Sequence, residues 1–270
     1  MVCRVRKTKK KKKKRKSGVR HRRSFELLWV GRVRSGPGPR PARSLERTVR
    51  AAVDIVDAQG LAALTMGRVA ERLGVTTMAL YRYVPGKEEL VDLMIDMARG
   101  APPVTGGLGW RAEIAQWARA DLAVLQRHRW LLESVMGRVP IGPNWLAWVE
   151  SALRALSGTG LHAKEMLAVI LLVDGHVRST AQISIGVSGT REWADNFGRV
   201  LETVAGDERY PALSALVAAG GFDARADDAE DTFEFGLVRL MDGVETLIRA
   251  RATAPRPSKS VRRAGTPRPK

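Results

Sequence analysis

The residues whose types and spacing suggest a specific chemistry lie between Thr65 and Val84. The pattern predicts a helix of about eight residues, a tight turn at Gly74-Val75 and a second helix of similar length. Glycine supplies the turn, and the small side chain of Ala70 lets the two helices cross closely, which is helix-turn-helix geometry. In such a unit the second helix lies in the DNA major groove with its N-terminal residues at the base edges. The chemistry that this stretch suggests is therefore hydrogen bonding to DNA.

Signals for helix starts and stops extend this pair to residues 44–98. Ser44 is a good N-cap, and apolar residues recur after it at helical spacing as far as Gly60. Thr76 or Thr77 is expected to open the second helix of the pair, and Pro85-Gly86 to stop it. A further helix is expected from Lys87, with carboxylates in its first turn, where the helix dipole favours them. We therefore expect a helix-turn-helix domain over residues 44–98, with three helices in its head and a fourth after them.

The rest of the folded chain shows helical patterning and no alternating strand pattern. Residues 100–109 are expected to form a linker. Further helices are expected near residues 110–127, 129–136, 143–157, 162–186, 190–205 and 228–250. The predicted fold class is therefore all-α, with an N-terminal three-helix helix-turn-helix domain and a larger helical domain over residues 106–250.

The net charge of +18 is concentrated at the two ends of the sequence. Residues 1–43 hold 18 Lys and Arg and one acid, residues 251–270 hold seven and none, and the remainder carries a net −6. Both ends are expected to be disordered, because a run such as Lys9–Lys14 repels itself and builds no core. The N-terminal extension is interpreted either as an arm that attracts phosphates or as sequence upstream of the true start. The clean beginning of the globular pattern at Ser44 slightly favours the second interpretation.

Several function classes lack support in the sequence. One cysteine and four scattered histidines give no metal-ligand spacing, so neither a metal nor another cofactor is implied. Asp174 and His176 fall on different helix faces, and no nucleophile elbow, P-loop or zinc-protease motif is found, so no enzyme is expected. No segment approaches the ~20 apolar residues of a membrane span, and no export signal is recognised. A cytoplasmic, nucleoid-associated protein is expected.

The run from Leu64 to Val91 resembles the DNA-binding head of tetracycline-repressor family regulators. The family pattern is close to T-x-x-x-x-A-x-x-L-G-V-x-x-x-x-L-Y-x-H/Y-F/V-x-x-K-x-x-L. Nearly every fixed position is present, namely Thr65, Ala70, Leu73, Gly74, Val75, Leu80, Tyr81, Tyr83, Val84, Lys87 and Leu90. A generic helix-turn-helix is a weak signal, whereas this extended match is specific.

The resemblance implies a set of DNA-contacting residues: Thr65, Met66, Thr76, Thr77, Met78, Ala79, Tyr81, Arg82, Tyr83 and Lys87. Tyr81 and Lys87 are assigned to phosphates, which a phenol hydroxyl and an ammonium both suit. Thr77, Met78 and Ala79 are assigned to base edges.

Other members of this set carry alternatives. Arg82 is expected to reach a guanine or a phosphate, and Tyr83 the backbone. Thr76 is either a contact or only an N-cap, and Tyr81 either a phosphate contact or a packing residue. The head holds six Lys and Arg against eight acids, which is low for a DNA reader. Few phosphate contacts, or help from the basic arm, would reconcile this charge with DNA binding.

Two helices are expected to form a dimer interface. Phe233, Leu237, Leu240, Val244 and Leu247 recur at steps of four and three, as in a bundle seam. The helix near 162–186 is apolar on more than one side. The segment F-G-L-V-R-L-M-D-G-V-E, which starts at residue 235, resembles the class-1 tetracycline-repressor-like C-terminal domain. That resemblance implies a homodimer through the helices near 162–186 and 228–250.

The candidates for an apolar ligand pocket are aromatic residues of the body: Trp117, His128, Trp130, Trp145, Trp148 and His176. Buried indoles need hydrogen-bond partners and often line cavities, although core packing is the competing interpretation for each. The residues that hold tetracycline and Mg²⁺ in the family's namesake are not matched. An unidentified small molecule other than tetracycline is therefore expected as the effector.

These features predict a sequence-specific transcriptional regulator, most simply a homodimeric repressor that a small molecule releases from a palindromic operator. Its two half-sites on double-stranded DNA would lie roughly 34–36 Å apart. The alternative is a non-specific nucleic-acid-binding protein driven by the basic N-terminal arm. Deletion of residues 1–43 distinguishes the two hypotheses, because only a sequence-specific regulator would still bind its operator specifically without the arm.

Overall fold

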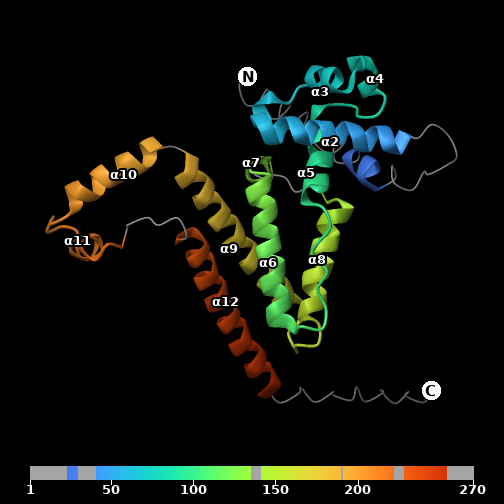
Figure 1. Ribbon diagram of the computed structural model, residues 1–270. Helices are drawn as coiled ribbons and strands as arrows, with labels where there is room; N and C mark the ends of the chain where they lie inside the picture. Colours follow the sequence, from blue (N-terminus) through green and yellow to red (C-terminus); the bar gives the residue numbers. More distant parts are fainter. Residues whose placement is uncertain (1–22, 30–40, 135–140, 190, 222–227, 254–270) are drawn as a thin grey trace, which may run out of the picture.

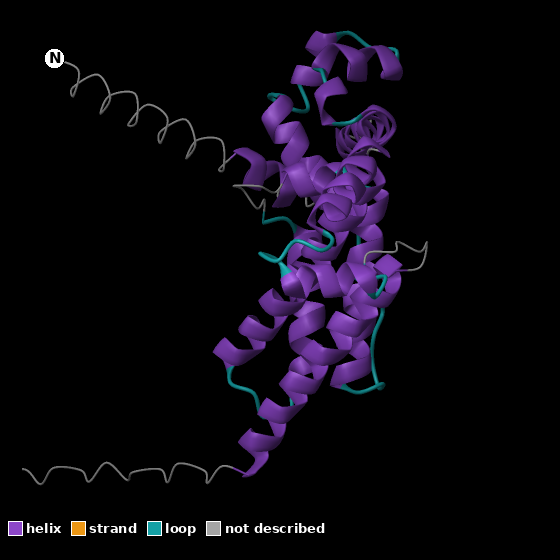
Figure 2. Ribbon diagram, turned by 90° about the vertical axis from the view of Figure 1, so that its left-hand side faces the viewer, coloured by secondary structure: helices purple, strands orange, loops and turns teal. Residues whose placement is uncertain are grey.

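The computed structural model describes residues 23–29, 41–134, 141–189, 191–221 and 228–253 (Figure 1). Within these residues the regular elements are helices and no strand occurs, as Figure 2 also shows. The prediction of an all-α fold, with a helix-turn-helix head on a larger helical body, is thereby confirmed.

The head comprises α2 (Pro41–Gln59), a 3₁₀ turn (Leu61–Ala63), α3 (Met66–Leu73), α4 (Thr77–Tyr81) and α5 (Lys87–Arg99). The body comprises α6 (Trp110–Arg127), α7 (Trp130–Ser134), α8 (Pro143–Leu156), α9 (Ala163–Gly189), α10 (Arg191–Val204), α11 (Pro211–Ala218) and α12 (Asp228–Thr253). The sequence pattern missed the 3₁₀ turn and α11. Most other boundaries lie within a few residues of their expected positions.

The turn between α3 and α4 forms as its residue types require. The Thr65 hydroxyl accepts a hydrogen bond from the Arg68 backbone N–H at 3.2 Å and caps α3. Gly74 ends that helix with φ 67°, in the left-handed region that glycine enters without steric cost. The Thr76 hydroxyl then accepts from the Ala79 N–H and caps α4. The expected start of the first helix at Ser44 was wrong, because α2 already begins at Pro41.

Residues 23–29 form a helical segment, which corrects the expectation that the whole of residues 1–43 is disordered. The Ser24 hydroxyl donates to Asp92 Oδ2 at 2.6 Å, and the Trp29 indole N–H donates to the Ile141 carbonyl at 2.9 Å. Leu28 is buried in the core. Ser24 and Leu28 are four residues apart, so they share one helix face and pack together against the fold. Residues 1–22 and 30–40 lie outside the described residues.

The long helices of the body run lengthwise beneath the head (Figure 1). α6 leads up to α7 beside the head, α8 returns, α9 rises again and α12 descends (Figure 1). The Trp117 ring on α6 meets the Trp148 ring on α8 edge-on, with centroids 5.6 Å apart. α10 and α11 project from one side of this bundle (Figure 1). α12 extends to Thr253. Residues 251–253, which were expected to belong to a disordered tail, are therefore helical.

One described helix is long and apolar enough to cross a membrane by length and composition. It is Ala163–Ser184 of α9, with a mean hydropathy of 1.2 over its best window, of which 33% is buried. The sequence analysis expected no such segment. Core helices of water-soluble bundles meet the same criterion, and α9 packs against α6, α8 and α12.

Candidate nucleic-acid interface and effector region

The helix-turn-helix lies at the end of the molecule farthest from the body (Figure 1). Met78 is 75% exposed and Tyr81 45% exposed, although large apolar and aromatic side chains are normally covered. Val84, Leu80 and Val69 are buried beneath them and hold α3 and α4 together. The short α4 thus presents its side chains outward on a rigid support, as a DNA-reading helix requires.

The structure places the predicted DNA contacts in three groups. The exposed side chains are Met78, Tyr81, Arg82, Tyr83 and Lys87, and those half-buried on α4 are Thr77 and Ala79. Thr65 and Thr76 are exposed caps whose hydroxyl oxygens already accept backbone hydrogen bonds, so the N-cap interpretation of Thr76 holds. Met66 is only 7% exposed and belongs to the core, and we therefore remove it from the candidate readers.

Cations of the head differ in whether they are free to bind phosphate. Arg68 donates to Gln59 Oε1 and to the Ala63 carbonyl, and Arg72 pairs with Asp54 at 3.3 Å. Arg82 and Lys87, by contrast, have no ion pair with any residue that the structure describes. Both unpaired cations follow Tyr81 in the chain, Arg82 as the C-cap of α4 and Lys87 at the start of α5, and they add positive charge after the reading helix despite the head's low total.

None of the six candidate ligand-pocket residues lines the cavity beside Leu93 and Asn144 or the cavity beside Ala115 and Leu237. Trp117 donates its indole N–H to the Trp148 carbonyl, and Trp148 donates to the Gly100 carbonyl, both at 3.0 Å. Trp145 lies one turn before Trp148 on α8 and is half-buried. These three tryptophans form one group on the seam of α6 and α8.

The other three candidates occupy two separate junctions. His128 and Trp130 both contact Asp57 on the head, at 2.8 Å and 2.7 Å from its Oδ1. His176 stacks on the Phe233 ring and its Nε2 lies 2.9 Å from the Phe233 carbonyl, between α9 and α12. In the structure these three residues therefore connect neighbouring helices through their side chains.

Two joints connect the head to the body. At the first, the Asp57 carboxylate of α2 is held by His128 and Trp130 beside α7. At the second, Asp96 Oδ1 of α5 accepts from the backbone N–H groups of Asn144 and Trp145, and so caps α8. A side chain at Gly142 would overlap the Asp96 carboxylate, so glycine is required for this approach. These contacts connect α7 and the start of α8 directly to the head.

Replacement of Asp57 by alanine tests the first joint. The donors of His128 and Trp130 would lose their acceptor while remaining largely buried, which costs about 1–3 kcal/mol of unfolding free energy. Urea unfolding measures this loss. Asp54→Ala is the matched control one turn earlier, because its exposed pair with Arg72 contributes about 0–1 kcal/mol. Equal losses of unfolding free energy in the two variants would contradict a connection between head and body through Asp57.

A buried ion pair lies where α5 enters the body, and sequence reasoning missed it. Arg99 Nη1 is 3.1 Å from Asp121 Oδ1, and Asp121 is fully buried on α6. The Arg99 guanidinium also lies over the Trp148 ring, 5.5 Å from its centroid. Burial raises the pKa of the Asp121 carboxyl above its usual value, and Arg99 opposes that rise. The sequence signal for this pair was the carboxylate of Asp121 among residues with apolar side chains on α6, namely Trp117, Ala118 and Leu122.

An exposed apolar face runs along α9. Leu167, Leu171 and Leu172 are each at least half exposed, as is Ile183 further along the helix. α12 packs beside α9, and Phe235 on α12 is also exposed. Arg119 on α6 binds Glu234 with two hydrogen bonds, at 2.6 and 2.7 Å, and fixes α12 in place. Apolar area of this kind on a rigid support is typical of protein–protein interfaces.

A helix-turn-helix head with outward-facing α4 on an all-helical body defines a DNA-binding transcriptional regulator. Residues 49–94 match the family model described as bacterial regulatory proteins, tetR family. Residues 102–248 match the tetracyclin repressor-like, C-terminal domain. The chain belongs to the tetR family of transcriptional regulators, as the sequence resemblance indicated.

Individual relatives agree with this assignment. The chain is 38% identical over 239 residues to the HTH-type transcriptional repressor DrrR1 of Streptomyces coeruleorubidus, covering 85% of this chain and 87% of that protein. It is 27% identical over 202 residues to the class A tetracycline repressor protein of Escherichia coli, covering 73% and 88%. The crystal structure of ActR from Streptomyces coelicolor in complex with actinorhodin superposes with a TM-score of 0.66 at 27% identity, covering 76% and 97%.

Proposed function

We propose that this protein is a homodimeric repressor that binds a palindromic operator and leaves it when a small molecule binds its body. The observation that carries the proposal is the exposed α4, followed by the unpaired cations Arg82 at its C-terminal end and Lys87 at the start of α5. In this arrangement Thr77, Met78 and Ala79 read base edges, while Tyr81 and Lys87 bind phosphates. Its cellular place is the cytoplasm, at the nucleoid.

The apolar face of α9 supports a dimer. A second copy placed against Leu167, Leu171 and the neighbouring part of α12 would cover this face and give a bundle of four helices. Two heads then read two half-sites roughly 34–36 Å apart, one turn of the duplex. The dimer interface proposed here uses the same two helices that the sequence pattern indicated.

The effector acts through the joints between body and head. A molecule seated in the body beside α6 and α8 would move these helices, which hold Asp57 and Asp96 of the head at their ends. Such a molecule can change the populations of two spacings of the heads only to the extent that it binds the protein in one spacing more tightly than in the other. Trp117, Trp145 and Trp148 remain the candidate lining residues. The ActR structure shows that a related protein holds actinorhodin.

Phosphate contacts by Lys87 and Tyr81 can be tested on DNA from the region upstream of the protein's own gene. Lys87→Ala is expected to weaken binding at least tenfold and to reduce the salt slope by about 2, because each of the two heads of the dimer loses one phosphate contact. Tyr81→Phe removes one hydroxyl and is expected to weaken binding several-fold. Fluorescence anisotropy at several salt concentrations gives both values.

The matched control is Lys164→Ala, which removes an exposed lysine at the far end of α9. It leaves the head unchanged and is expected to leave the affinity unchanged. Affinity that falls equally in Lys164→Ala and Lys87→Ala would mean that total charge, and not α4 and its neighbours, determines binding.

A further inference from the structure

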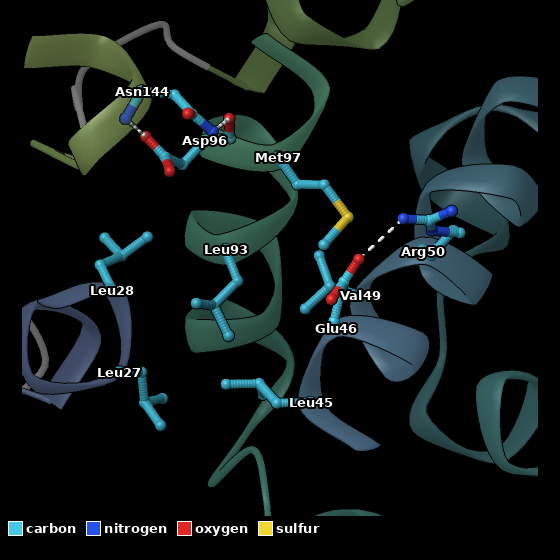
Figure 3. Close-up of a pocket in the computed structure, with 10 residues that line it drawn as sticks. All are labelled: Leu27, Leu28, Leu45, Glu46, Val49, Arg50, Leu93, Asp96, Met97 and Asn144. Atoms are coloured by element: carbon cyan, nitrogen blue, oxygen red, sulfur yellow. Dashed lines mark hydrogen bonds and ion pairs between the residues drawn. The ribbon is translucent and has the colours of Figure 1, made fainter. Parts of the chain in front are cut away.

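A cavity of about 300 Å³ lies where the head meets the start of α8, and the proposed function makes no use of it (Figure 3). Its walls come from the segment 23–29, from α2 and α5, and from the first turn of α8. Figure 3 shows the leucines of the segment 23–29 across from Leu93 of α5. The apolar side chains that line the cavity are Leu27, Leu28, Leu45, Val49, Leu93 and Met97.

This cavity has the size of a ligand site. Packed protein interiors contain few voids larger than a water molecule, whereas pockets for small organic ligands begin at about 300 Å³. Leu27, Leu45 and Met97 pack against the core of the head, but each is only half-buried on the side of the cavity. Apolar side chains beside a cavity have no packing partner on that side. A small apolar molecule would therefore gain contacts with several of them at once.

Two hydrogen bonds fix the wall that the segment 23–29 contributes. The buried Ser24 hydroxyl donates to Asp92 of α5 at 2.6 Å. At the other end of the segment, the Trp29 indole N–H donates to the Ile141 carbonyl at 2.9 Å, just before α8. Neither bond involves a side chain that lines the cavity. The site is therefore built in advance, which reduces the ordering that a ligand would have to impose.

The polar side chains of the lining are mostly hydrogen-bond acceptors. Glu46 and Asp96 bring two carboxylates, and Arg50 pairs with Glu46 at 2.8 Å, so it offsets only one of the two charges. Asn144 donates its Nδ2 to the Asp96 carbonyl at 2.7 Å. Its Oδ1 accepts no hydrogen bond from any residue that the structure describes. A ligand with a positive charge and an N–H donor suits this lining, and an anion does not.

We propose that this cavity is a binding site for a small apolar amine. The apolar part of the amine packs against the leucines and Met97, and its ammonium group binds beside Asp96 and Asn144. The site is separate from the effector region beside α6 and α8, and it does not depend on the operator that α4 reads. Because the segment 23–29, the head and the first turn of α8 all line it, a bound amine stabilises their folded arrangement.

Three naphthalenes of nearly equal size test this proposal on the full chain. At about pH 7 aminomethylnaphthalene is a cation, hydroxymethylnaphthalene is neutral and naphthoate is an anion. Binding is followed by NMR of the methionine methyl groups, because Met97 lines the cavity and Met78 lies exposed on α4. The Met97 methyl signal is expected to shift during the titration, while the Met78 signal stays in place.

The amine is expected to bind with a dissociation constant on the order of 0.1–1 mM, as suits a ligand of about twelve non-hydrogen atoms. The alcohol is expected to bind several-fold more weakly and naphthoate at least tenfold more weakly. The net charge of +18 would favour the anion if attraction were unspecific. Naphthoate that binds as tightly as the amine, or an amine that shifts Met78 as much as Met97, would overturn the proposal.

A matched pair of variants tests the location. Leu45→Trp places a larger side chain in the cavity and is expected to weaken binding of the amine at least tenfold. Leu61→Trp makes the same change at another half-buried leucine of the head, outside the cavity, and is expected to leave binding unchanged. Equal losses in the two variants would overturn the proposal. Circular dichroism melting checks that both are folded, and the Met97 titration of the unaltered chain needs neither variant.

A second pair of variants tests the preference for a cation. Glu46→Gln removes one carboxylate of the lining, and Glu71→Gln removes an exposed carboxylate of α3 outside it. Glu46→Gln is expected to weaken binding of the amine about threefold and to leave binding of the alcohol unchanged. Glu71→Gln is expected to change neither. An equal effect of Glu46→Gln on the amine and the alcohol would contradict the role of charge in this site.

Discussion

Replacement of Leu171 by glutamate is expected to convert the proposed dimer to a monomer. Leu171 is 62% exposed in the single chain, on the apolar face of α9. Burial of a carboxylate without a partner in a dimer interface costs several kcal/mol, which raises the dimer dissociation constant by roughly 10²–10⁴. Because a palindrome needs two linked heads, operator affinity is expected to fall by a similar order. Sedimentation velocity and DNA anisotropy measure the two effects.

Val104→Glu is the control for this substitution. Val104 is 98% exposed in the loop between α5 and α6, so the same added charge meets only solvent there. The control is expected to stay dimeric and to bind DNA as the wild type does. A Leu171→Glu protein that sediments as a dimer at micromolar concentration would refute the α9 interface.

The second large effect is expected at the buried ion pair. Arg99→Met leaves the Asp121 carboxylate charged, buried and without its partner, which costs about 3–5 kcal/mol. For a chain of this size the melting temperature is expected to fall by on the order of 10 °C. The double variant Arg99→Met/Asp121→Leu removes both charges and is expected to recover most of that loss, because buried pairs are often replaceable by apolar residues.

The loss in Arg99→Met is expected to depend on pH. Burial raises the pKa of Asp121, and loss of Arg99 removes the larger of the two arginine charges, those of Arg99 and Arg178, that oppose this rise. A folded-state pKa above the unfolded value means that the folded protein binds the proton more tightly, so stability rises as the pH falls. The deficit of Arg99→Met relative to wild type is therefore expected to shrink as the pH falls, because the unpaired carboxyl of the variant takes up its proton at a higher pH than that of the wild type. A constant deficit would mean that lost packing, and not the unpaired charge, is responsible.

Residues with local roles in the head were predictable from the sequence. Thr65, Gly74 and Thr76 determine the ends of α3 and α4 through their own backbone and hydroxyl chemistry, and each acts where the pattern placed it. Apart from α11, the helices of the body followed from apolar periodicity in the same way. These features depend on neighbours within a few residues, which a sequence displays directly.

Features that depend on distant partners were not predictable. Arg68 and Arg72 resemble free cations in the sequence, but they bind Gln59 and Asp54 of α2. The hydroxyl of Ser24 finds Asp92 across 68 residues, so the docked segment looked like part of a disordered tail.

The body residues show the same limit. His128 and Trp130 resemble pocket residues until Asp57 is placed beside them. Arg99 and Asp121 are separated by the linker and the first eleven residues of α6, so their pairing is visible only in the fold. Residue type alone therefore identified candidates, and tertiary contact assigned their roles.

The central claim is that α4 and its neighbours read a specific palindrome. The most direct test is DNase I footprinting of the full chain on the DNA upstream of its own gene, at about 150 mM salt, beside a variant in which Lys9–Lys14 are replaced by glutamine. We expect one protected palindrome with half-sites about one helical turn apart, protected by both proteins. Uniform protection along the DNA that disappears in the variant would contradict it, because binding would then come from the arm alone.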